Sequence, residues 1–413
     1  IKEKTMNSLT DSVNLAPSKS TYVLVNLIDY LLKNIRHGTI EVHWPDGNIE
    51  TYTGKENLHL KSVLIVHDWA LFKQVVSSGA IGFGEGYLNN RWSSPDIALL
   101  LETLNLNLDE INKHIGKSKF IKFITRLSHV LKPNSRSGSK KNIYEHYDLG
   151  NSFYEKWLDP SMTYSSAMFK NKKNSLESGQ NEKYKCLADS IDLKKEHHVL
   201  EIGCGWGGFA EYAASQIGCR VTGLTISQAQ YDYACDRMQK KGLSNLVTIK
   251  LQDYRDVDGK FDRIASIEMF EAVGEKYWAT FFDKVSDILK PGGKAGLQII
   301  TIDEGKFKTY RKNADFIQKY IFPGGMLPSK VALKNEFDKA HLKLQETVDF
   351  RLDYAETLAQ WRVRFNEQWH EIKPMGFDER FKHMWEYYLA YCEAGFKTGT
   401  IDVSQFYLHK RQN

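Results

Sequence analysis

The hydrophobic pattern changes character partway along the chain and predicts two domains. From residue 18 to about 110 the patterns are short and mixed. An amphipathic helix pattern over 22–35 precedes the stretch T-I-E-V-H-W-P-D-G-N-I-E-T-Y. That stretch alternates apolar and polar residues around Pro45-Asp46-Gly47, which predicts a β-hairpin. With a further helix expected near 68–76, these elements predict a small α+β domain.

The second half of the chain alternates apolar strands with helical stretches. The predicted strands read V-L-E-I, V-T-G-L-T-I, V-T-I-K-L, F-D-R-I-A-S-I and K-A-G-L-Q-I-I. Such alternation indicates a parallel sheet with helices on both faces, hence an α/β fold. The segment P-N-S-R-S-G-S-K-K-N has the composition of a linker. We therefore expect a polar, disordered tail at 1–17, an N-terminal domain at 18–132, a linker at 133–142 and a catalytic domain at 143–413.

Composition narrows the class of protein. The 413 residues are 42% hydrophobic and 26% charged, as in an ordinary globular protein, and the net charge is only +5. Five scattered cysteines without a C-x-x-C pair argue against a disulfide framework and a structural zinc site. No apolar run reaches the roughly 18 residues of a membrane-spanning helix, and no signal-peptide pattern opens the chain. These features predict a cytoplasmic enzyme.

One segment concentrates positive charge. Residues 111–144 contain no Asp or Glu but nine Lys and Arg residues. Within it, an apolar helical face is flanked by basic residues, which suits the surface of an anionic membrane. The alternative is that this face packs on the catalytic domain, and both interpretations stay open. The apolar face consists of Phe120, Ile124, Leu127 and Leu131.

A glycine-rich turn follows the first strand of the second domain, in V-L-E-I-G-C-G-W-G-G at 199–208. In open α/β sheets this turn binds the ligand, and Gly203 and Gly205 allow the backbone to approach it closely. A dinucleotide enzyme would place an acid about 20 residues further on. Here Thr225 and Gln230 stand at the second strand tip instead. A P-loop is excluded because no G-K-[ST] follows.

The third strand ends in L-Q-D-Y-R-D, which brings Gln252 and Asp253 to the sheet edge where an adenine fits. Together, E-I-G-C-G-W-G-G, G-L-T-I-S-x-x-Q and L-Q-D-Y-R-D resemble a Rossmann-like class I S-adenosylmethionine methyltransferase. More narrowly, the chain resembles the cyclopropane fatty acid synthase family. Further matching motifs are H-Y-D-L-G-N at 146–151, L-D-P-S-M-T-Y-S-S-A at 158–167, M-F-E-A-V-G at 269–274, Y-I-F-P-G-G-M-L-P-S at 320–329 and D-Y-A-E-T-L at 353–358.

The resemblance implies a reaction and a cofactor site. The family transfers a one-carbon unit from S-adenosylmethionine to a cis double bond in a phospholipid acyl chain. The partner would then be phospholipid at the inner face of the membrane, with the protein bound there peripherally; a homodimer stays open. The cofactor contacts that we expect are Tyr164, Ser165, Glu201, Gly203, Cys204, Gly205, Thr225, Gln230, Gln252, Asp253 and Ile267.

The family resemblance also implies a base. Methyl transfer leaves a carbocation, and a bound bicarbonate removes the proton, held by a Cys, a Glu, a His, a backbone group near an Ile, and a Tyr. Two of these five positions differ here, which leaves bicarbonate binding and ring closure open. His146 is a further candidate for lining the site. In the same order, the five positions are Ser166, Glu271, Gln298, Ile300 and Tyr354.

Several alternatives follow from the changed anion site. The first is methylation of the unsaturated chain without ring closure. A second, of another class, is a lipid-binding protein without catalysis, which would release no S-adenosylhomocysteine. A small-molecule methyltransferase fits less well, because Y-I-F-P-G-G-M-L-P-S is specific to the family. A nucleic-acid enzyme is disfavoured, because the basic residues precede the catalytic domain and no N-P-P-Y motif appears.

Overall fold

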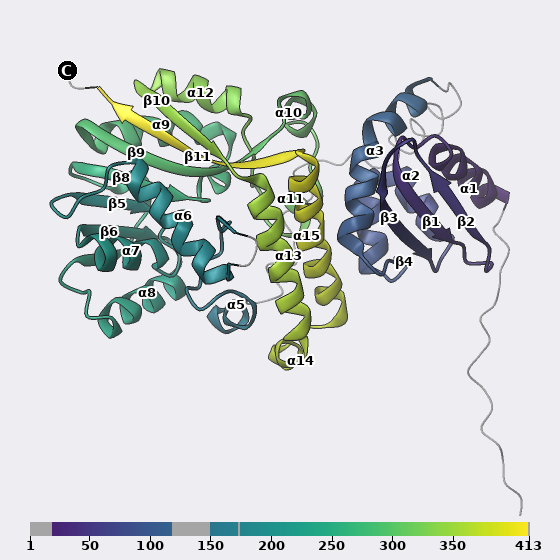
Figure 1. The fold of residues 1–413 in the computed structure, drawn as a ribbon, viewed down its shortest axis with the longest axis horizontal. Coiled ribbons are helices and arrows are strands. Elements are labelled where there is room, and N and C mark those ends of the chain that lie inside the picture. The colour runs from purple at the N-terminus through teal and green to yellow at the C-terminus, as the bar shows by residue number, and fades with distance from the viewer. Residues whose placement is uncertain (1–18, 118–148, 172–173, 412–413) are drawn as a thin grey trace, which may run out of the picture. The chain divides into compact units, whose positions relative to one another are not determined.

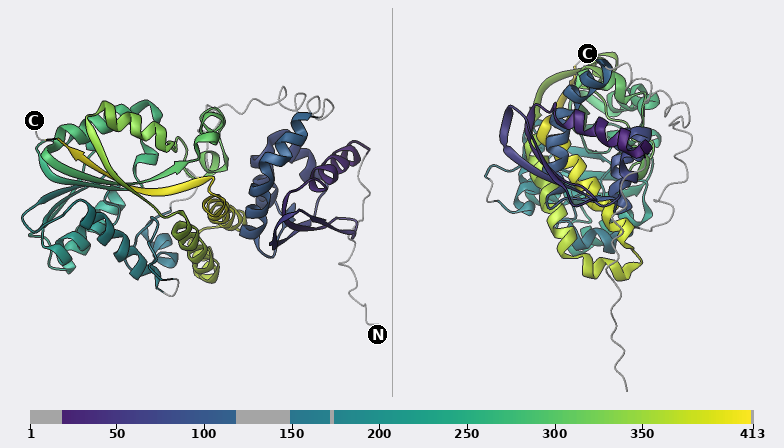
Figure 2. Two further views of the ribbon diagram at one scale, coloured as in Figure 1. Left: turned by 45° about the horizontal axis from the view of Figure 1, so that its top comes forward. Right: turned by 90° about the vertical axis from the view of Figure 1, so that its right-hand side faces the viewer.

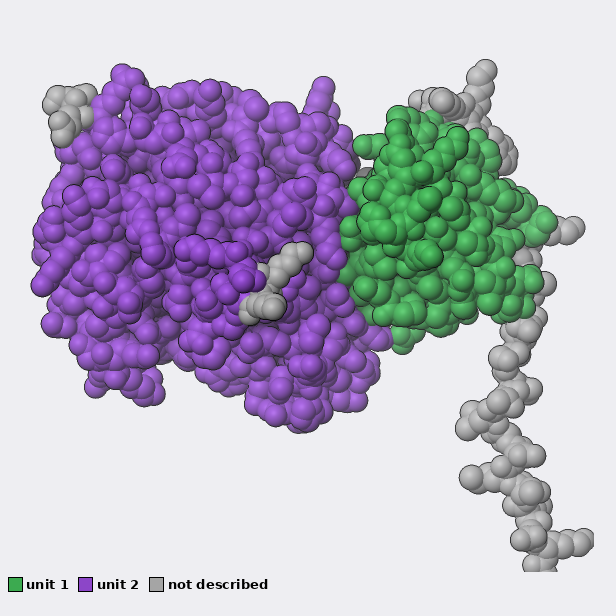
Figure 3. Space-filling view, in the orientation of Figure 1, with its two compact units in different colours: residues 1–133 green, residues 134–413 purple. Residues whose placement is uncertain are grey.

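The computed structural model describes residues 19–117, 149–171 and 174–411. The chain divides into two compact units, residues 1–133 and 134–413 (Figure 3). His146, the apolar face of the basic segment, the N-terminal tail and the predicted linker lie outside the described residues.

The first unit is a four-stranded sheet with three helices. The predicted hairpin is confirmed: β1 and β2 pair antiparallel, while β3 runs parallel to β1 in the order β2-β1-β3-β4. Helix α3 is attached through the buried Asn107, whose Oδ1 accepts from the backbone N–H groups of Arg36 and His37. The elements are α1 (Lys19–Leu32), β1 (His37–His43), β2 (Ile49–Thr53), β3 (Glu56–Val66), α2 (Ala70–Leu88), β4 (Trp92–Ser93) and α3 (Ile97–Lys117).

Two helix boundaries differ from the sequence pattern. The first helix ends at Leu32 rather than residue 35. The helix expected near 68–76 continues through the glycine-rich stretch to Leu88. Gly79 interrupts it with φ 55° and ψ −135°, so α2 consists of two helical segments joined by a kink. The helix expected from the sequence corresponds to the first of these segments.

The second unit is built on a seven-stranded sheet, in the order β10-β11-β9-β8-β5-β6-β7. The five predicted strands are present and pair parallel with one another, which confirms the α/β fold class. Two antiparallel strands, β10 and β11, extend the sheet beyond β9. The strands are β5 (His198–Ile202), β6 (Arg220–Thr225), β7 (Val247–Leu251), β8 (Phe261–Ile267), β9 (Leu289–Ile302), β10 (Leu342–Asp349) and β11 (Ile401–Lys410).

Helices cover both faces of this sheet. Figure 1 shows α7 and α8 on one face and α9 and α12 on the other, and the tilted view in Figure 2 agrees. Apolar side chains such as Phe281 and Leu297 fill one core cluster, and Phe209 and Ala234 belong to the other. The helices are α5 (Asn151–Trp157), α6 (Leu176–Ser190), α7 (Gly208–Tyr212), α8 (Gln228–Lys240), α9 (Trp278–Ile288), α10 (Glu304–Tyr310), α11 (Phe316–Tyr320), α12 (Lys330–Lys339), α13 (Arg351–Glu367), α14 (Trp369–Ile372) and α15 (Glu379–Thr398).

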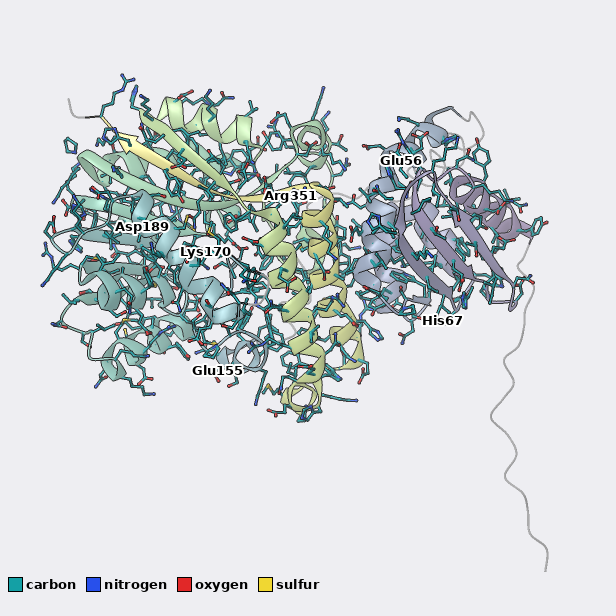
Figure 4. All side chains as sticks on the ribbon, viewed as in Figure 1. Glu56, His67, Glu155, Lys170, Asp189 and Arg351 are labelled. Carbon is teal, nitrogen blue, oxygen red and sulfur yellow. The ribbon has the colours of Figure 1, made fainter. Side chains whose placement is uncertain are left out.

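Helices α13 and α15 pack against each other and carry most of the C-terminal aromatic residues. Arg351, labelled in Figure 4, begins α13 and donates from Nη1 to the carbonyls of Phe396 and Lys397 at the end of α15, both at 2.7 Å. This contact fixes α13, which carries Tyr354, relative to the end of α15. Among the helices that the structure describes, none is both long enough and apolar enough to cross a bilayer.

Candidate active site

The glycine turn after β5 has the backbone that a closely bound ligand requires. Gly203 and Gly205 adopt φ values of +81° and +51°. A Cβ at Gly203 would lie 2.6 Å from Cγ of Met269, whereas a Cβ at Gly205 would meet no atom within 4 Å. The Cys204 N–H donates to the Leu224 carbonyl at 2.7 Å, which joins the turn to β6. The turn is therefore packed on one side and open on the other.

Glu201, at the end of β5, offers an acceptor beside this turn. The side chain is only 3% exposed, and its Oε2 accepts no hydrogen bond from any described residue. Burial raises the pKa of Glu201 well above its usual value, while Arg237 and Lys183 act in the opposite direction. A buried acceptor without a partner suits a donor on a ligand. The residue therefore fits the ammonium group of the expected cofactor.

The expected adenosine contacts lie on neighbouring strand tips. Thr225 Oγ1 donates to Gln230 Oε1 at 2.9 Å. Between them, Ile226 is 79% exposed, an apolar surface at the strand tip that the sequence pattern did not single out. Asp253 accepts from the backbone N–H of Arg255 at 2.9 Å and pairs with its guanidinium group.

Three other residues expected at the cofactor site are Gln252, Ile267 and Cys204. Gln252 donates from Nε2 to the Asp256 carbonyl at 2.7 Å, which holds the loop after β7. Ile267 is the last residue of β8 and is partly buried. Cys204 is buried, and burial raises the pKa of its thiol. A thiol with a raised pKa is a poor nucleophile, so the environment of Cys204 does not favour covalent chemistry.

Tyr164 and Ser165, both expected at the cofactor site, form hydrogen bonds with buried side chains. The Tyr164 hydroxyl lies 2.7 Å from that of Tyr388. Ser165 Oγ accepts from Nζ of Lys183 at 2.6 Å. Lys183 is fully buried, and desolvation lowers its pKa to about 7, although Glu268, Asp159 and Glu201 favour its charged form. The sequence alone did not identify Lys183, because it lies in a predominantly polar helix.

Glu268 occupies the centre of the expected anion site. The residue follows β8 directly, and the sheet register pairs its neighbour Ile267 with Gln298. Its Oε1 accepts from the Ser166 backbone N–H at 2.9 Å and from Gln298 Nε2 at 2.7 Å. Its Oε2 accepts from the Tyr354 hydroxyl at 2.5 Å. Sequence reasoning missed Glu268, although an acid directly after an apolar strand was a usable signal.

Ser166 contributes its backbone rather than its side chain. Its hydroxyl donates to the Ala167 carbonyl at 2.9 Å, while its N–H points to Glu268. The structure therefore places the Ser166 N–H, and not its hydroxyl, against the Glu268 carboxylate. The contact comes from the main chain, so it does not depend on which side chain stands at position 166.

Glu271 forms the second half of the site. Its Oε1 accepts from the Ile300 N–H at 2.6 Å, and its Oε2 has no hydrogen-bond partner in the described part of the chain. Burial, and then the charge of Glu268, raise the pKa of Glu271 to about 8. Two neighbouring carboxyl groups resist double ionisation. At neutral pH Glu271 is therefore the neutral partner. Burial also raises the pKa of Glu268, but hydrogen bonds from Tyr354, Ser166 and Gln298 act in the opposite direction.

Glu271→Gln should change the pH dependence of stability. A raised pKa in the folded state stabilises the protein below the ordinary carboxyl pKa, and this stabilisation is lost as the pH rises towards about 8. Glutamine cannot ionise, so the variant should gain about 1–3 kcal/mol relative to the parent protein between pH 5 and pH 9. Urea unfolding at both pH values measures this difference. Parallel pH curves for the two proteins would show that Glu271 is already ionised at neutral pH.

A cluster of aromatic rings extends from Tyr354, whose hydroxyl donates to Glu268. The Tyr164 ring centroid lies 5.4 Å from that of Trp361 and 5.5 Å from that of Trp157, and Tyr354 lies 6.2 Å from Trp361. The indole N–H groups of Trp157 and Trp361 are buried and have no hydrogen-bond partner among the described residues. The environment is thus apolar and rich in π faces, which stabilise a positive charge.

A hollow of about 350 Å³ adjoins the chain segment after Glu271. Residues 272–277, Ala314, Gln318 and residues 324–326 line it. The Met326 N–H donates to the Glu271 carbonyl at 2.9 Å. The hollow is therefore bordered by two of the motifs that carry the family resemblance.

Comparison with known proteins gives consistent matches. The family model described as mycolic acid cyclopropane synthetase matches residues 134–406. Tuberculostearic acid methyltransferase UfaA1 of Mycobacterium tuberculosis is 36% identical over 390 residues, covering 92% of this chain and 89% of the relative. Cyclopropane-fatty-acyl-phospholipid synthase of Escherichia coli is 39% identical over 341 residues, covering 81% of this chain and 84% of that protein.

Solved structures agree with these sequence matches. The mycolic acid cyclopropane synthase CmaA1, in complex with SAH and CTAB, superposes with a TM-score of 0.61 at 28% identity. The match covers 65% of this chain and 97% of that structure.

Proposed function

Because this chain belongs to the mycolic acid cyclopropane synthetase family, we propose that it transfers a one-carbon unit from S-adenosylmethionine to the double bond of unsaturated phospholipid acyl chains. One observation carries the proposal. A carboxylate pair, Glu268 and Glu271, lies in an aromatic setting in the same fold unit as an open glycine turn. This combination suits an electrophilic group transfer followed by loss of a proton.

The cofactor site is assigned to this chain's own groups. When bound, S-adenosylmethionine supplies a methyl group on a positively charged sulfur. The unpartnered Oε2 of Glu201 would accept a hydrogen bond from the cofactor's ammonium group. The open side of Gly205 accommodates the cofactor's close approach. Ile226, exposed between Thr225 and Gln230, offers an apolar surface to the adenine ring of the cofactor.

The acceptor chemistry explains the rest of the site. An alkene is a poor nucleophile, so its π electrons must be held in line with the methyl carbon. The resulting carbocation requires protection from water and a nearby anion. Rings of Tyr164 and Trp361 provide π faces, and the Glu268 carboxylate provides negative charge. The aromatic residues of α13 and α15 thus have two roles: they form part of the hydrophobic core, and they exclude water from the carbocation.

A second product is favoured by a specific observation. The anion position holds a protein carboxylate, and a relative that covers 92% of this chain is named a methyltransferase rather than a cyclopropane synthase. Both favour methylation without ring closure as the alternative outcome. With a trideuterated methyl donor, ring closure keeps two deuterium atoms and leaves no double bond. A methylene branch keeps two beside a double bond, and a methyl branch keeps all three.

The acceptor itself can be tested with matched lipids. Purified protein is incubated with S-adenosylmethionine and vesicles of an anionic phospholipid whose acyl chains each carry one cis double bond. The control vesicles contain the fully saturated analogue. We expect S-adenosylhomocysteine to form only with the unsaturated lipid. Equal release of S-adenosylhomocysteine with both kinds of vesicle would indicate that the head group is the acceptor. No release with either would favour a lipid-binding protein without catalysis.

A further inference from the structure

Four hydrogen-bond donors at the expected anion site point to carboxylates of the protein itself. Ser166, Gln298 and Tyr354 donate to Glu268, and Ile300 donates to Glu271. The family resemblance assigned these four positions, together with Glu271, to the binding of a free anion. In this chain, a side-chain carboxylate already receives them.

A hydrogen bond from Gln405 fixes the orientation of the Gln298 side-chain amide. Its Oε1 accepts from Nε2 of Gln405 on β11 at 3.0 Å, so its own Nε2 is directed to Glu268. Gln405 is fully buried, and its Oε1 in turn accepts from the Tyr407 hydroxyl. The chain of amides therefore presents a donor, not an acceptor, to the carboxylate. Such an arrangement matches an ionised Glu268.

The backbone at Glu268 is held in an unfavourable conformation. Its φ is +49°, in the left-handed region that favours glycine, and its N–H donates to the Gln298 carbonyl at 2.8 Å. A residue with a side chain costs about 1–3 kcal/mol in such a conformation and persists where its surroundings fix it. Glycine would relieve this strain, so the carboxylate is the part of the residue that the site uses.

Neighbouring groups favour an ionised carboxylate at this position, against burial, which raises the pKa of Glu268. Tyr354 on α13 contributes a hydroxyl donor, and Lys183 on α6 favours the charged form of the carboxyl group. Glu271, from the turn after β8, is the neutral member of the pair. Of the two carboxyl groups, Glu268 is the one whose oxygens receive three donors, so the negative charge is favoured there.

We infer that Glu268 is the proton acceptor of the reaction, so that this enzyme needs no free bicarbonate. This inference rests on the proposed function. The alkene π electrons form a bond to the methyl carbon while the carbon–sulfur bond breaks and its electron pair remains on sulfur. For ring closure, a C–H bond of the transferred methyl group breaks and its electrons form the bond between that carbon and the carbocation. For an unsaturated product, a C–H bond on a carbon next to the carbocation breaks and its electrons form a double bond. In both cases the proton moves to Glu268.

The inference is tested by kinetics in buffer stripped of carbon dioxide. The parent protein should keep its rate, and added bicarbonate should change kcat less than about twofold. Glu268→Gln keeps the size of the side chain but removes its basicity, so kcat should fall by about 10²–10⁴-fold. The Kd for S-adenosylmethionine should remain within about threefold. Glu356→Gln, which removes an exposed carboxylate on α13, serves as the matched control and should keep full activity.

A second variant tests the role of the carboxylate directly. Glu268→Gly relieves the backbone strain and opens space for a small anion. We expect added formate or bicarbonate to raise kcat of the Glu268→Gly variant by at least about tenfold. A parent enzyme that requires bicarbonate, or a Glu268→Gln variant within tenfold of its rate, would overturn the inference. A parent protein that releases no S-adenosylhomocysteine with unsaturated lipid would instead overturn the proposed function.

Discussion

Replacing Gly203 by alanine is expected to lower kcat/KM by about 10²-fold and to weaken S-adenosylmethionine binding. The new Cβ would lie 2.6 Å from Cγ and 2.8 Å from Cβ of Met269, and φ at this position is +81°. Met269 directly follows Glu268, so its displacement moves both the cofactor turn and the carboxylate. Misplacement of reacting groups by about 1 Å has effects of this size. Cofactor titration and steady-state kinetics measure the two losses separately.

Gly242→Ala is the matched control for this variant. Gly242 has φ +67°, but a Cβ there would meet no atom within 4 Å. The substitution therefore adds backbone strain of about 1 kcal/mol without a collision. It should lower stability slightly and leave kcat/KM unchanged. Similar activity losses in both variants would show that strain, not the contact with Met269, explains the effect.

Trp361→Ala is expected to reduce the free energy of unfolding by about 3–5 kcal/mol, as for other large-to-small changes in a core. Trp361 is fully buried on α13, and its ring contacts those of Trp157, Tyr164 and Tyr354. The cavity would lie among the rings expected to face the carbocation. Urea unfolding followed by circular dichroism measures the loss.

Leu352→Ala provides the comparison on the same helix. Leu352 is 60% exposed, so its removal should change the free energy of unfolding by less than about 0.5 kcal/mol. If Trp361→Ala were no more destabilising than Leu352→Ala, the aromatic cluster would not be the packed core described above.

The fold of the second unit was largely predictable from sequence. Its five parallel strands are short apolar runs separated by helical patterns, and the glycine turn follows the first of them. The strand β11 was not predicted, because Ser404 and Gln405 are polar yet fully buried. Their burial is possible because each forms a side-chain hydrogen bond within the unit. A hydrophobic pattern does not record such bonds.

The active site was predictable only in part. Family motifs located Glu271, Gln298, Ile300 and Tyr354, and the structure brings them together. Glu268 was missed because its donors come from residues 102, 30 and 86 positions away along the chain. Its importance arises from that convergence and from its φ value, neither of which a local pattern contains.

The most direct test of the central claim uses S-adenosylmethionine with a fully deuterated methyl group. Protein and cofactor are incubated with mixed vesicles of saturated and unsaturated phospholipids, and the released acyl chains are analysed by mass spectrometry. We predict deuterium only in chains that carried a double bond, in proportion to the S-adenosylhomocysteine formed. S-adenosylhomocysteine without label in any acyl chain, or label in saturated chains, would contradict transfer to the acyl double bond.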